Sequence, residues 1–177
     1  MRPRTRIALL AVAVGLVASA CLPRPLPPLP ENGRLPDDVL TTISSSCRVL
    51  NPLADPLREM LADANSHGIK LRPETRGYTI PGIEPPRIES CYRSYAMQVW
   101  WRDYYCFFGQ CGYAAVPGTS IHGWGKAIDF EDQHGALTFT SPGYIYLAWN
   151  AWRYGFHHPP WAAESQPNAE AWHWEAE

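Results

Sequence analysis

The chain has 177 residues, which is long enough for one domain with a sizeable hydrophobic core. Its formal net charge is −2, from 15 basic and 17 acidic side chains, and no stretch gathers basic residues into a stripe. A nucleic-acid binding surface needs such a stripe to neutralise phosphates. The composition therefore excludes DNA and RNA as expected partners, and the length leaves no room for a second domain.

The first twenty residues have the composition of an export signal. Three arginines occupy the first six positions, and an uncharged apolar run follows from Ile7 to Ala20. This run is too short to span a membrane as a helix, and Ala18-Ser19-Ala20 supplies the small residues of a cleavage site. We predict residues 1–20 to be a signal peptide, whose removal would change the net charge from −2 to −5.

The residues after this signal suggest a membrane tether. Cys21 follows the cleavage site directly, as in a bacterial lipobox, although Ala18 stands where such motifs usually carry leucine. Because Cys21 has the position of a lipidated cysteine, we favour its lipidation over secretion of the protein with a free N-terminal cysteine. Leu22 to Pro36 contains six prolines, a composition typical of an extended polyproline II spacer. We assign residues 21–40 to this lipidated tether and 41–177 to one folded domain. The expected product is an exported monomer on the outer face of the cytoplasmic membrane or in the cell-wall space, attached to the membrane only through its lipid.

Cysteine usage supports this division of the chain. Of five cysteines, setting Cys21 aside for lipid leaves Cys47, Cys91, Cys106 and Cys111, an even number in an oxidising compartment. Four cysteines allow three disulfide connectivities. We favour Cys106 with Cys111, because the four residues between them can form a small loop, and this leaves Cys47 to pair with Cys91. A zinc site made of cysteines is disfavoured, since the sequence has no second close cysteine pair.

Hydrophobic spacing predicts several elements in chain order. A core helix is expected over residues 53–67, ended by Gly68, and an amphipathic helix over 95–105. Strands are expected over 88–93, 127–130 and 171–175, and a further helix from Ser141-Pro142 to Trp152, with Gly155 at its end. These elements predict an α+β domain in which helices pack on a small antiparallel sheet.

We expect structural rather than functional roles for four side chains near these elements. Trp100 and Trp101 in the second helix are expected in the core rather than on a substrate surface. Glu131 and Asp132, which follow the strand at 127–130, are expected to be solvated loop acids.

Two histidines and an aspartate form a candidate metal site. His122 and Asp129 lie seven residues apart, and Gly123 and Gly125 between them permit a tight turn. Asp129 lies in an apolar stretch, where an unpaired carboxylate would be costly. His173 near the C-terminus offers the second imidazole, whereas a hydrogen-bonded or surface role is expected for His67, His134, His157 and His158. Two imidazoles and a carboxylate suit Zn²⁺, and a catalytic zinc takes three protein ligands and leaves a fourth position for water. We predict His122, Asp129 and His173 as zinc ligands.

Glu170 is the candidate general base. It stands three residues before His173 and can take a proton from the water that the metal activates. Residues three apart face opposite sides of a regular strand, so Glu170 must reach the metal from the preceding loop or a bulge. Glu175 and Glu177 are weaker candidates for the same role. Because Glu175 shares the strand face of His173, it could instead be an outer partner of that histidine.

These residues resemble a known family. The run Ser-x-His-x-x-Gly-x-Ala-x-Asp from Ser120 to Asp129, followed by Glu-x-Trp-His from Glu170 to His173, resembles the VanY-type D-alanyl-D-alanine carboxypeptidases. Those enzymes belong to the wider lysostaphin, D-Ala-D-Ala carboxypeptidase and hedgehog metal-site fold. The segment Ser90-Cys91-Tyr92-Arg93-Ser94 is similar to the family's Ser-Gly-Tyr-Arg-Ser, with cysteine in place of the glycine. The resemblance covers residues 53–177 in order and spacing.

The resemblance implies a zinc peptidase that hydrolyses peptidoglycan stem peptides. Arg93 would then bind the substrate and polarise the scissile carbonyl. Residues implied to bind substrate are Arg93, Ser94, Gln98 and Ser120, although Ser120 could instead orient a ligand or form a turn. Both a terminal D-alanyl-D-alanine bond and an L-alanyl-D-glutamate bond remain possible targets.

The rival hypothesis is a non-catalytic, zinc-dependent module that binds the cell wall, because the hedgehog relative uses this fold as a signalling ligand. Glu170 and Arg93 argue against it, since a module that only binds has no chemical need for either.

Overall fold

The computed structural model describes residues 31–75 and 89–176, and its fold is α+β with antiparallel strands, as predicted. One sheet is the hairpin of β1 (Leu40–Ser44) and β2 (Cys47–Leu50). The second sheet has the strand order β3-β4-β7-β6, with β5 paired to β4. Its strands are β3 (Arg72–Pro73), β4 (Ala127–Asp132), β5 (Gly135–Ala136), β6 (Phe156–His157) and β7 (His173–Ala176).

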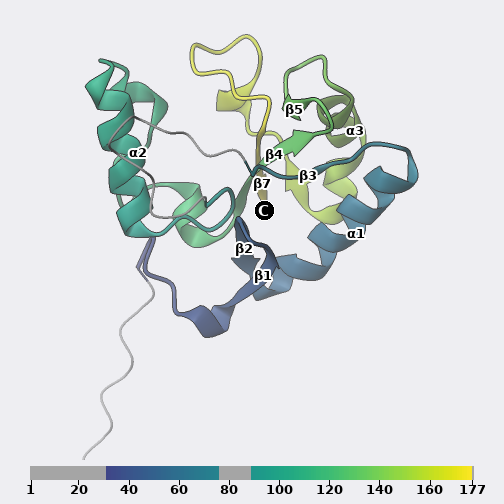
Figure 1. The fold of residues 1–177 in the computed structure, drawn as a ribbon, viewed down its shortest axis with the longest axis horizontal. Helices are drawn as coiled ribbons and strands as arrows, with labels where there is room; N and C mark the ends of the chain where they lie inside the picture. The colour runs from purple at the N-terminus through teal and green to yellow at the C-terminus, as the bar shows by residue number, and fades with distance from the viewer. Residues whose placement is uncertain (1–30, 76–88, 177) are drawn as a thin grey trace, which may run out of the picture.

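Three α-helices in residues 31–75 and 89–176 surround these sheets. They are α1 (Ala54–Ser66), α2 (Tyr95–Phe107) and α3 (Pro142–Asn150). Short 3-10 turns connect them: η1 (Asp37–Val39), η2 (Asn51–Leu53), η3 (Cys111–Tyr113), η4 (Ile121–Trp124), η5 (Ala151–Tyr154) and η6 (Pro160–Ala162). Figure 1 shows β4 and β7 in the middle, with α1 and α3 on one side and α2 on the other. Within the described ranges, no helix is both long enough and apolar enough to cross a membrane.

The core lies between the central strands and the two helices α1 and α3. Leu57 and Met60 on α1 and Leu147 on α3 are fully buried, and they join Ile128 and Phe130 of β4 in one hydrophobic cluster. Burial of this apolar surface is the main favourable term in folding. Because every residue of β4 is buried, this strand forms the centre of the domain.

The helix at residues 142–150 ends earlier than the sequence predicted. The chain continues from Asn150 as the 3-10 turn η5, so Trp152 turns outward and is 72% exposed. Tyr146 takes the buried position beside Leu147, because its hydroxyl donates to the carboxylate of Asp63 and lies 3.3 Å from the carbonyl oxygen of Met60 on α1.

Helix α2 contributes little to this core. Only Met97 and Gln98 among its residues are buried. Trp100 and Trp101 are half-buried, so the prediction that they belong to the core was wrong. Their rings pack instead along their own helix, Trp100 on Tyr104 and Trp101 on Tyr105, because α2 lies apart from α1 and α3.

The folded domain begins before the boundary predicted at residue 41. Asn32 and Gly33 are buried, and Asn32 Nδ2 donates to the carbonyl oxygen of Ser120 at 2.7 Å. The backbone of Gly33 donates to Gly123 and accepts from Tyr95, at 2.8 Å each. This part of the predicted tether is therefore packed against the domain, which corrects the 21–40 assignment. Residues 1–30, with the predicted signal peptide and Cys21, lie outside the described residues.

The strand predicted at 88–93 is not a strand where the structure describes it. Residue 88 lies outside the described residues, and residues 90–93 are irregular. Their backbone groups bond alternately to the β1–β2 hairpin and to the region of His122, so no continuous ladder forms. Both favoured disulfides are present, and Cys47–Cys91 joins this segment to β2 while Cys106–Cys111 joins the end of α2 to η3.

Glu131 and Asp132 are buried, so the prediction of solvated loop acids was wrong. Strand β4 runs to residue 132 and carries both side chains inward. Glu131 accepts hydrogen bonds from Arg72 and Thr75, each at 2.7 Å. Asp132 accepts from the backbone N–H of Gly143, at the start of α3, and of His134. These bonds satisfy two carboxylates that burial would otherwise destabilise.

We predict that Asp132→Ala lowers the free energy of unfolding by about 2–3 kcal/mol, because it leaves the buried Gly143 N–H without an acceptor. Urea denaturation measures the change. The exposed carboxylate of Glu59 on α1 provides the control, and Glu59→Ala should change stability by less than about 0.5 kcal/mol. Equal effects of the two substitutions would contradict the capping role of Asp132.

Candidate metal centre

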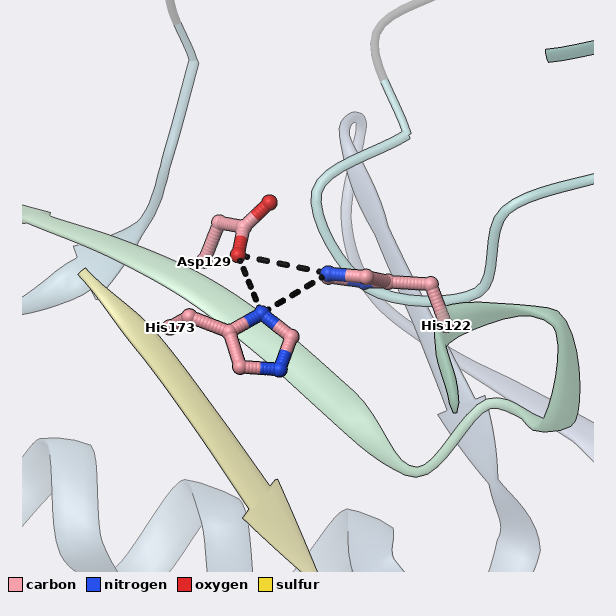
Figure 2. Close-up of side chains that lie close together, drawn as sticks. All are labelled: His122, Asp129 and His173. Carbon is pink, nitrogen blue, oxygen red and sulfur yellow. Dashed lines mark hydrogen bonds and ion pairs between the residues drawn. The ribbon is translucent and has the colours of Figure 1, made fainter. Parts of the chain in front are cut away.

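The three predicted metal ligands meet in one place (Figure 2). Asp129 on β4 and His173 on β7 are directly paired in the antiparallel register, which puts both side chains on the same face of the sheet. His122 comes from η4, which ends at Gly125 with a φ of +65°. This left-handed conformation favours glycine and lets the chain turn from η4 into β4.

The geometry of the three side chains suits a metal ion. The Oδ1 atom of Asp129 lies 3.0 Å from His173 Nδ1 and 3.3 Å from His122 Nε2. The two ring nitrogens are 3.2 Å apart, and all three residues are buried. Ligand atoms about 2.1 Å from a tetrahedral metal are separated from one another by roughly 3.4 Å. The trio therefore presents two nitrogens and one oxygen at almost the spacing that a shared ion requires.

Each candidate ligand is also held on its far side. His122 Nδ1 donates to the carbonyl oxygen of Cys91 at 2.8 Å, which leaves Nε2 facing the centre. His173 Nε2 donates to Glu175 at 3.1 Å, which is the second of the two roles that the sequence left open for this glutamate, and this leaves Nδ1 facing the centre. Arg93 donates to Asp129 Oδ2 at 2.9 Å. Such outer partners fix the ring tautomers and orient metal ligands.

The protonation of the trio reflects burial and these neighbours. Burial and the nearby Arg93 lower the pKa of His122 to about 4, so this imidazole is neutral at pH 7. Burial also opposes a charge on His173, but its bonds to Asp129 and Glu175 outweigh burial and raise its pKa to about 9. Burial alone would raise the pKa of Asp129, whereas His122, His173 and Arg93 hold it well below its ordinary value.

Glu170 reaches the centre from the loop before β7, as the sequence predicted. The backbone N–H of His173 donates to the carbonyl oxygen of Glu170 at 3.2 Å, which closes a tight turn. This turn brings Glu170 Oε2 to 4.0 Å from His173 Nδ1. Burial, together with the charge of Asp129, raises the pKa of Glu170 to about 7. A carboxylate with such a pKa is well matched to exchange protons near neutral pH.

A cavity of about 400 Å³ opens onto the centre. Arg93, Ser120 and Glu170 line it together with the three candidate ligands. The remaining lining residues include several aromatic side chains that sequence reasoning did not assign to the site: Trp101, Tyr105, Tyr113, Trp161 and Trp172. The sequence offered one signal for them, since Trp101 and Tyr105 lie one helical turn apart on α2, downstream of Arg93.

Ser94 and Gln98, which the resemblance implied to bind substrate, do not line this cavity. The hydroxyl of Ser94 caps α2 by accepting from Met97 N. Gln98 is 2% exposed, and its amide bonds to Asn32 and to the backbone of Arg93 and Gly118. Both residues therefore support the segment that carries Arg93, because their polar atoms are already bound within the protein.

His158 is hydrogen-bonded, as predicted, and its partner lies next to the site. Its Nε2 atom donates to the carbonyl oxygen of Glu170 at 3.0 Å, and so it holds the loop that carries the candidate base. Burial lowers the pKa of His158, which keeps this ring neutral. Nothing in its local sequence distinguishes it from the other histidines outside the trio.

Comparison with solved structures defines the fold. The chain aligns with VanY, a vancomycin resistance D,D-pentapeptidase solved with Zn(II), with a TM-score of 0.57 and 22% identity over 80% of this chain and 82% of that one. It aligns with the LD-carboxypeptidase LdcB at a TM-score of 0.59 and 20% identity, covering 81% and 70%. The D,D-dipeptidase VanXYg, solved with a D-Ala-D-Ala phosphinate analogue, gives 0.55 and 19%, covering 81% and 58%. No protein-family model and no curated protein sequence matches the chain.

The chain thus has the fold shared by these carboxypeptidases and dipeptidases, as its motifs indicated. In that fold, the described residues place a buried His-Asp-His cluster beside a glutamate and an arginine. Fold and site together define a candidate metal centre with a carboxylate and a guanidinium beside it.

We predict that a divalent metal releases about one proton from the two imidazoles at pH 8, because His173 is protonated below about 9 whereas His122 is already neutral. Because the metal must displace this proton from His173, metal affinity should fall about tenfold for each pH unit below about 9. Calorimetric titration in buffers of different ionisation enthalpy counts the protons. At pH 10 the count should be about one proton lower than at pH 8, because His173 is already deprotonated there, and equal counts at the two pH values would contradict the raised pKa.

Proposed function

We propose that the protein is a zinc-dependent peptidase of the bacterial cell wall that hydrolyses peptidoglycan stem peptides, as a D-alanyl-D-alanine carboxypeptidase. The observation that carries this proposal is the position of Glu170, whose carboxylate lies 4.0 Å from His173 Nδ1 and has a pKa raised to about 7. Arg93 shares the same cavity. A base and a guanidinium beside a three-ligand set are the groups that metal-assisted amide hydrolysis needs.

Zinc fits the residues present. Two neutral imidazole nitrogens and a carboxylate oxygen form the donor set of many catalytic zinc sites, and three protein ligands leave a coordination position open. His122, Asp129 and His173 would hold the ion. When bound, zinc supplies a Lewis acid that polarises a carbonyl group and lowers the pKa of water. The VanY structure with Zn(II) supports this choice of metal.

The chain's own residues would carry the proton and stabilise the charge. Glu170 accepts the proton of the attacking water and returns it to the leaving amine. Arg93 donates hydrogen bonds to the carbonyl oxygen as negative charge grows there. Its Nη2 is bound to Asp129, whereas its buried Nε has no hydrogen-bond partner in the part of the chain that the structure describes. This Nε–H is the donor that a substrate oxygen would satisfy.

The choice of a D,D-carboxypeptidase rests on the solved relatives and on one feature of the cavity. VanYB was solved with D-alanine-D-alanine and VanXYg with a phosphinate analogue of it, while LdcB is an LD-carboxypeptidase. Among the described cavity-lining residues, Arg93 is the single arginine or lysine. A guanidinium near the metal offers a charge-assisted partner for a terminal carboxylate as well as for a carbonyl oxygen.

Export and lipidation form part of this proposal. A peptidase of the cell wall has to leave the cytoplasm, and residues 1–21 have the composition of a signal peptide followed by a lipidated cysteine. Two disulfides in the described part of the chain support an oxidising compartment. Lipidation at Cys21 would place the domain at the outer face of the cytoplasmic membrane, where its substrate lies. We expect it to act there as a monomer.

Glu170→Gln distinguishes the peptidase from a wall-binding module. The amide keeps the size of the side chain but cannot accept a proton, so we expect turnover to fall 10²–10⁴-fold while zinc affinity is retained. The measurements are hydrolysis of a pentapeptide stem and zinc content. Glu164, an exposed glutamate nearby in the sequence, provides the control, and Glu164→Gln should be silent. Wild-type protein that binds wall peptides and cleaves none would support the binding module instead.

The cleaved bond can be assigned with a panel of stem peptides. A D,D-carboxypeptidase should release D-alanine from a pentapeptide ending in D-Ala-D-Ala. Amidation of that C-terminus removes a charge-assisted contact, so kcat/KM should fall about 10–100-fold. Mass spectrometry of the products identifies the bond. Preference for a tetrapeptide would assign an L,D-carboxypeptidase, and cleavage between L-alanine and D-glutamate, indifferent to amidation, would assign an endopeptidase.

A further inference from the structure

The irregular segment Ser90–Arg93 has the β1–β2 hairpin on one side. The backbone N–H of Ser90 donates to the carbonyl oxygen of Ser46 at 3.0 Å, and that of Tyr92 donates to Arg48 at 2.7 Å. The hydroxyl of Ser90 also donates to the Ser46 carbonyl, at 3.1 Å. The segment is thus attached to the hairpin at its first and third residues.

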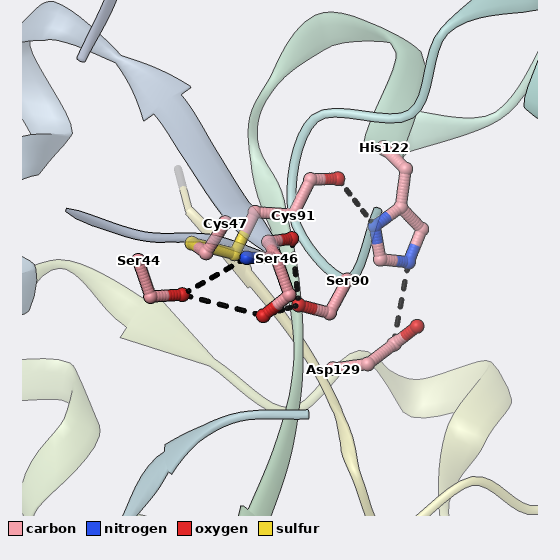
Figure 3. The surroundings of a disulfide bond; sticks show 7 residues. All are labelled: Ser44, Ser46, Cys47, Ser90, Cys91, His122 and Asp129. Carbon is pink, nitrogen blue, oxygen red and sulfur yellow. Dashed lines mark hydrogen bonds and ion pairs between the residues drawn. A yellow bond between two sulfur atoms is a disulfide. The ribbon is translucent and has the colours of Figure 1, made fainter. Parts of the chain in front are cut away.

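Its other side supports the metal centre (Figure 3). The carbonyl oxygen of Ser90 accepts from the backbone N–H of Asp129 at 2.8 Å. The next carbonyl, that of Cys91, accepts from His122 Nδ1 at 2.8 Å. The backbone N–H of Arg93 then donates to the carbonyl oxygen of His122 at 3.0 Å. Two of the three candidate ligands therefore depend on the position of four consecutive residues.

A disulfide lies between these two sides. Cys91 is bonded to Cys47, and Cys47 stands in β2 between the two residues whose carbonyls hold the segment, Ser46 and Arg48. Both cysteines are at most 1% exposed. Because the segment forms no strand ladder, this bond is a covalent constraint where regular hydrogen bonding is missing.

We infer that the Cys47–Cys91 disulfide positions the metal centre, by holding the carbonyl groups of Ser90 and Cys91 where they orient Asp129 and His122. A shift of the Cys91 carbonyl would release Nδ1 of His122 and allow the ring to rotate, which would move Nε2 away from the ion. The assignment rests on the metal-binding part of the proposed function. It gives the disulfide a role in metal affinity in addition to its role in stability.

The size of the expected effect follows from other metal sites. Loss of an outer partner that orients a histidine ligand weakens metal binding 10–100-fold. The disulfide acts in the same indirect way, on two ligands through one segment, so we apply this range to its loss. The other disulfide, Cys106–Cys111, joins α2 to η3 rather than the segment Ser90–Arg93, so it provides a control for the loss of a disulfide elsewhere in the domain.

The experiment compares zinc affinity in two double variants by competition with a chromogenic chelator. We expect Cys47→Ala/Cys91→Ala to bind zinc 10–100-fold more weakly than the wild type. Cys106→Ala/Cys111→Ala should stay within about twofold of it. The absorption spectrum of bound Co²⁺ should change in the first variant only, because its coordination geometry changes. Equal zinc affinities in the two variants would overturn the inference.

A second pair of variants separates positioning from stability. Leu57→Ala opens a cavity in the core beneath α1 and lowers stability while the disulfide stays intact, so it measures how much zinc affinity depends on stability alone. Cys47→Val/Cys91→Ala refills the volume of the disulfide without a covalent bond, and it keeps the test available if the double alanine variant does not fold. Weak zinc binding in the refilled variant, with normal binding in Leu57→Ala, supports positioning. Normal binding in the refilled variant overturns it.

This readout is independent of the peptidase proposal. Zinc affinity is measured without substrate. A wild-type protein that cleaves no stem peptide would therefore contradict the proposed function and leave the result on the disulfide unchanged. Conversely, unaltered zinc affinity in the refilled Cys47→Val/Cys91→Ala variant would remove the role of the disulfide and leave the peptidase proposal standing.

Discussion

The arrangement of the site depends on one buried carboxylate, that of Asp129. Removing an ionised carboxylate from water is costly unless opposite charges and hydrogen bonds compensate. Here Oδ1 faces His122 and His173, while Oδ2 accepts from Arg93 at 2.9 Å. Three groups from separate parts of the chain therefore converge on this side chain, and a divalent ion would add further compensation. The buried charge explains why the basic groups gather here.

The pairing of β4 with β7 fixes the relative positions of Asp129 and His173. Asp129 and His173 are partners in the β4–β7 register, and a shift of one residue would put their side chains on opposite faces of the sheet. The apolar residues of β4 and β7, such as Ile128 opposite Trp174, fix that register because they must face the core. The hydrophobic core thus sets the distance between two candidate ligands, and sheet stability and site geometry have the same cause.

Irregular segments complete the site. Arg93 is the last residue of the irregular segment Ser90–Arg93. His122 lies in the 3-10 turn η4, and Glu170 lies in the loop before β7. Each is restrained by contacts outside its own element: Arg93 through Gln98, His122 through the Cys91 carbonyl, and the Glu170 loop through His158. Functional groups commonly lie on loops that a rigid scaffold positions. In this protein, a disulfide and buried hydrogen bonds provide much of that rigidity.

The sequence by itself determined the candidate ligands, the candidate base and the fold class. The spacing of His122 and Asp129, the pair Glu170 and His173, and the hydrophobic periodicity of the helices and strands are all local patterns. Cysteine arithmetic likewise predicted both disulfides. Only the tertiary structure decided which polar residues face the cavity and which are buried in hydrogen bonds that support the fold around it. Gln98 and Asp132 appear polar and accessible in sequence, yet both are buried, because their partners come from Asn32, Gly118 and Gly143 in other elements. A hydrogen bond between distant residues satisfies a buried polar group without leaving a local signal, so these roles could not be predicted from spacing.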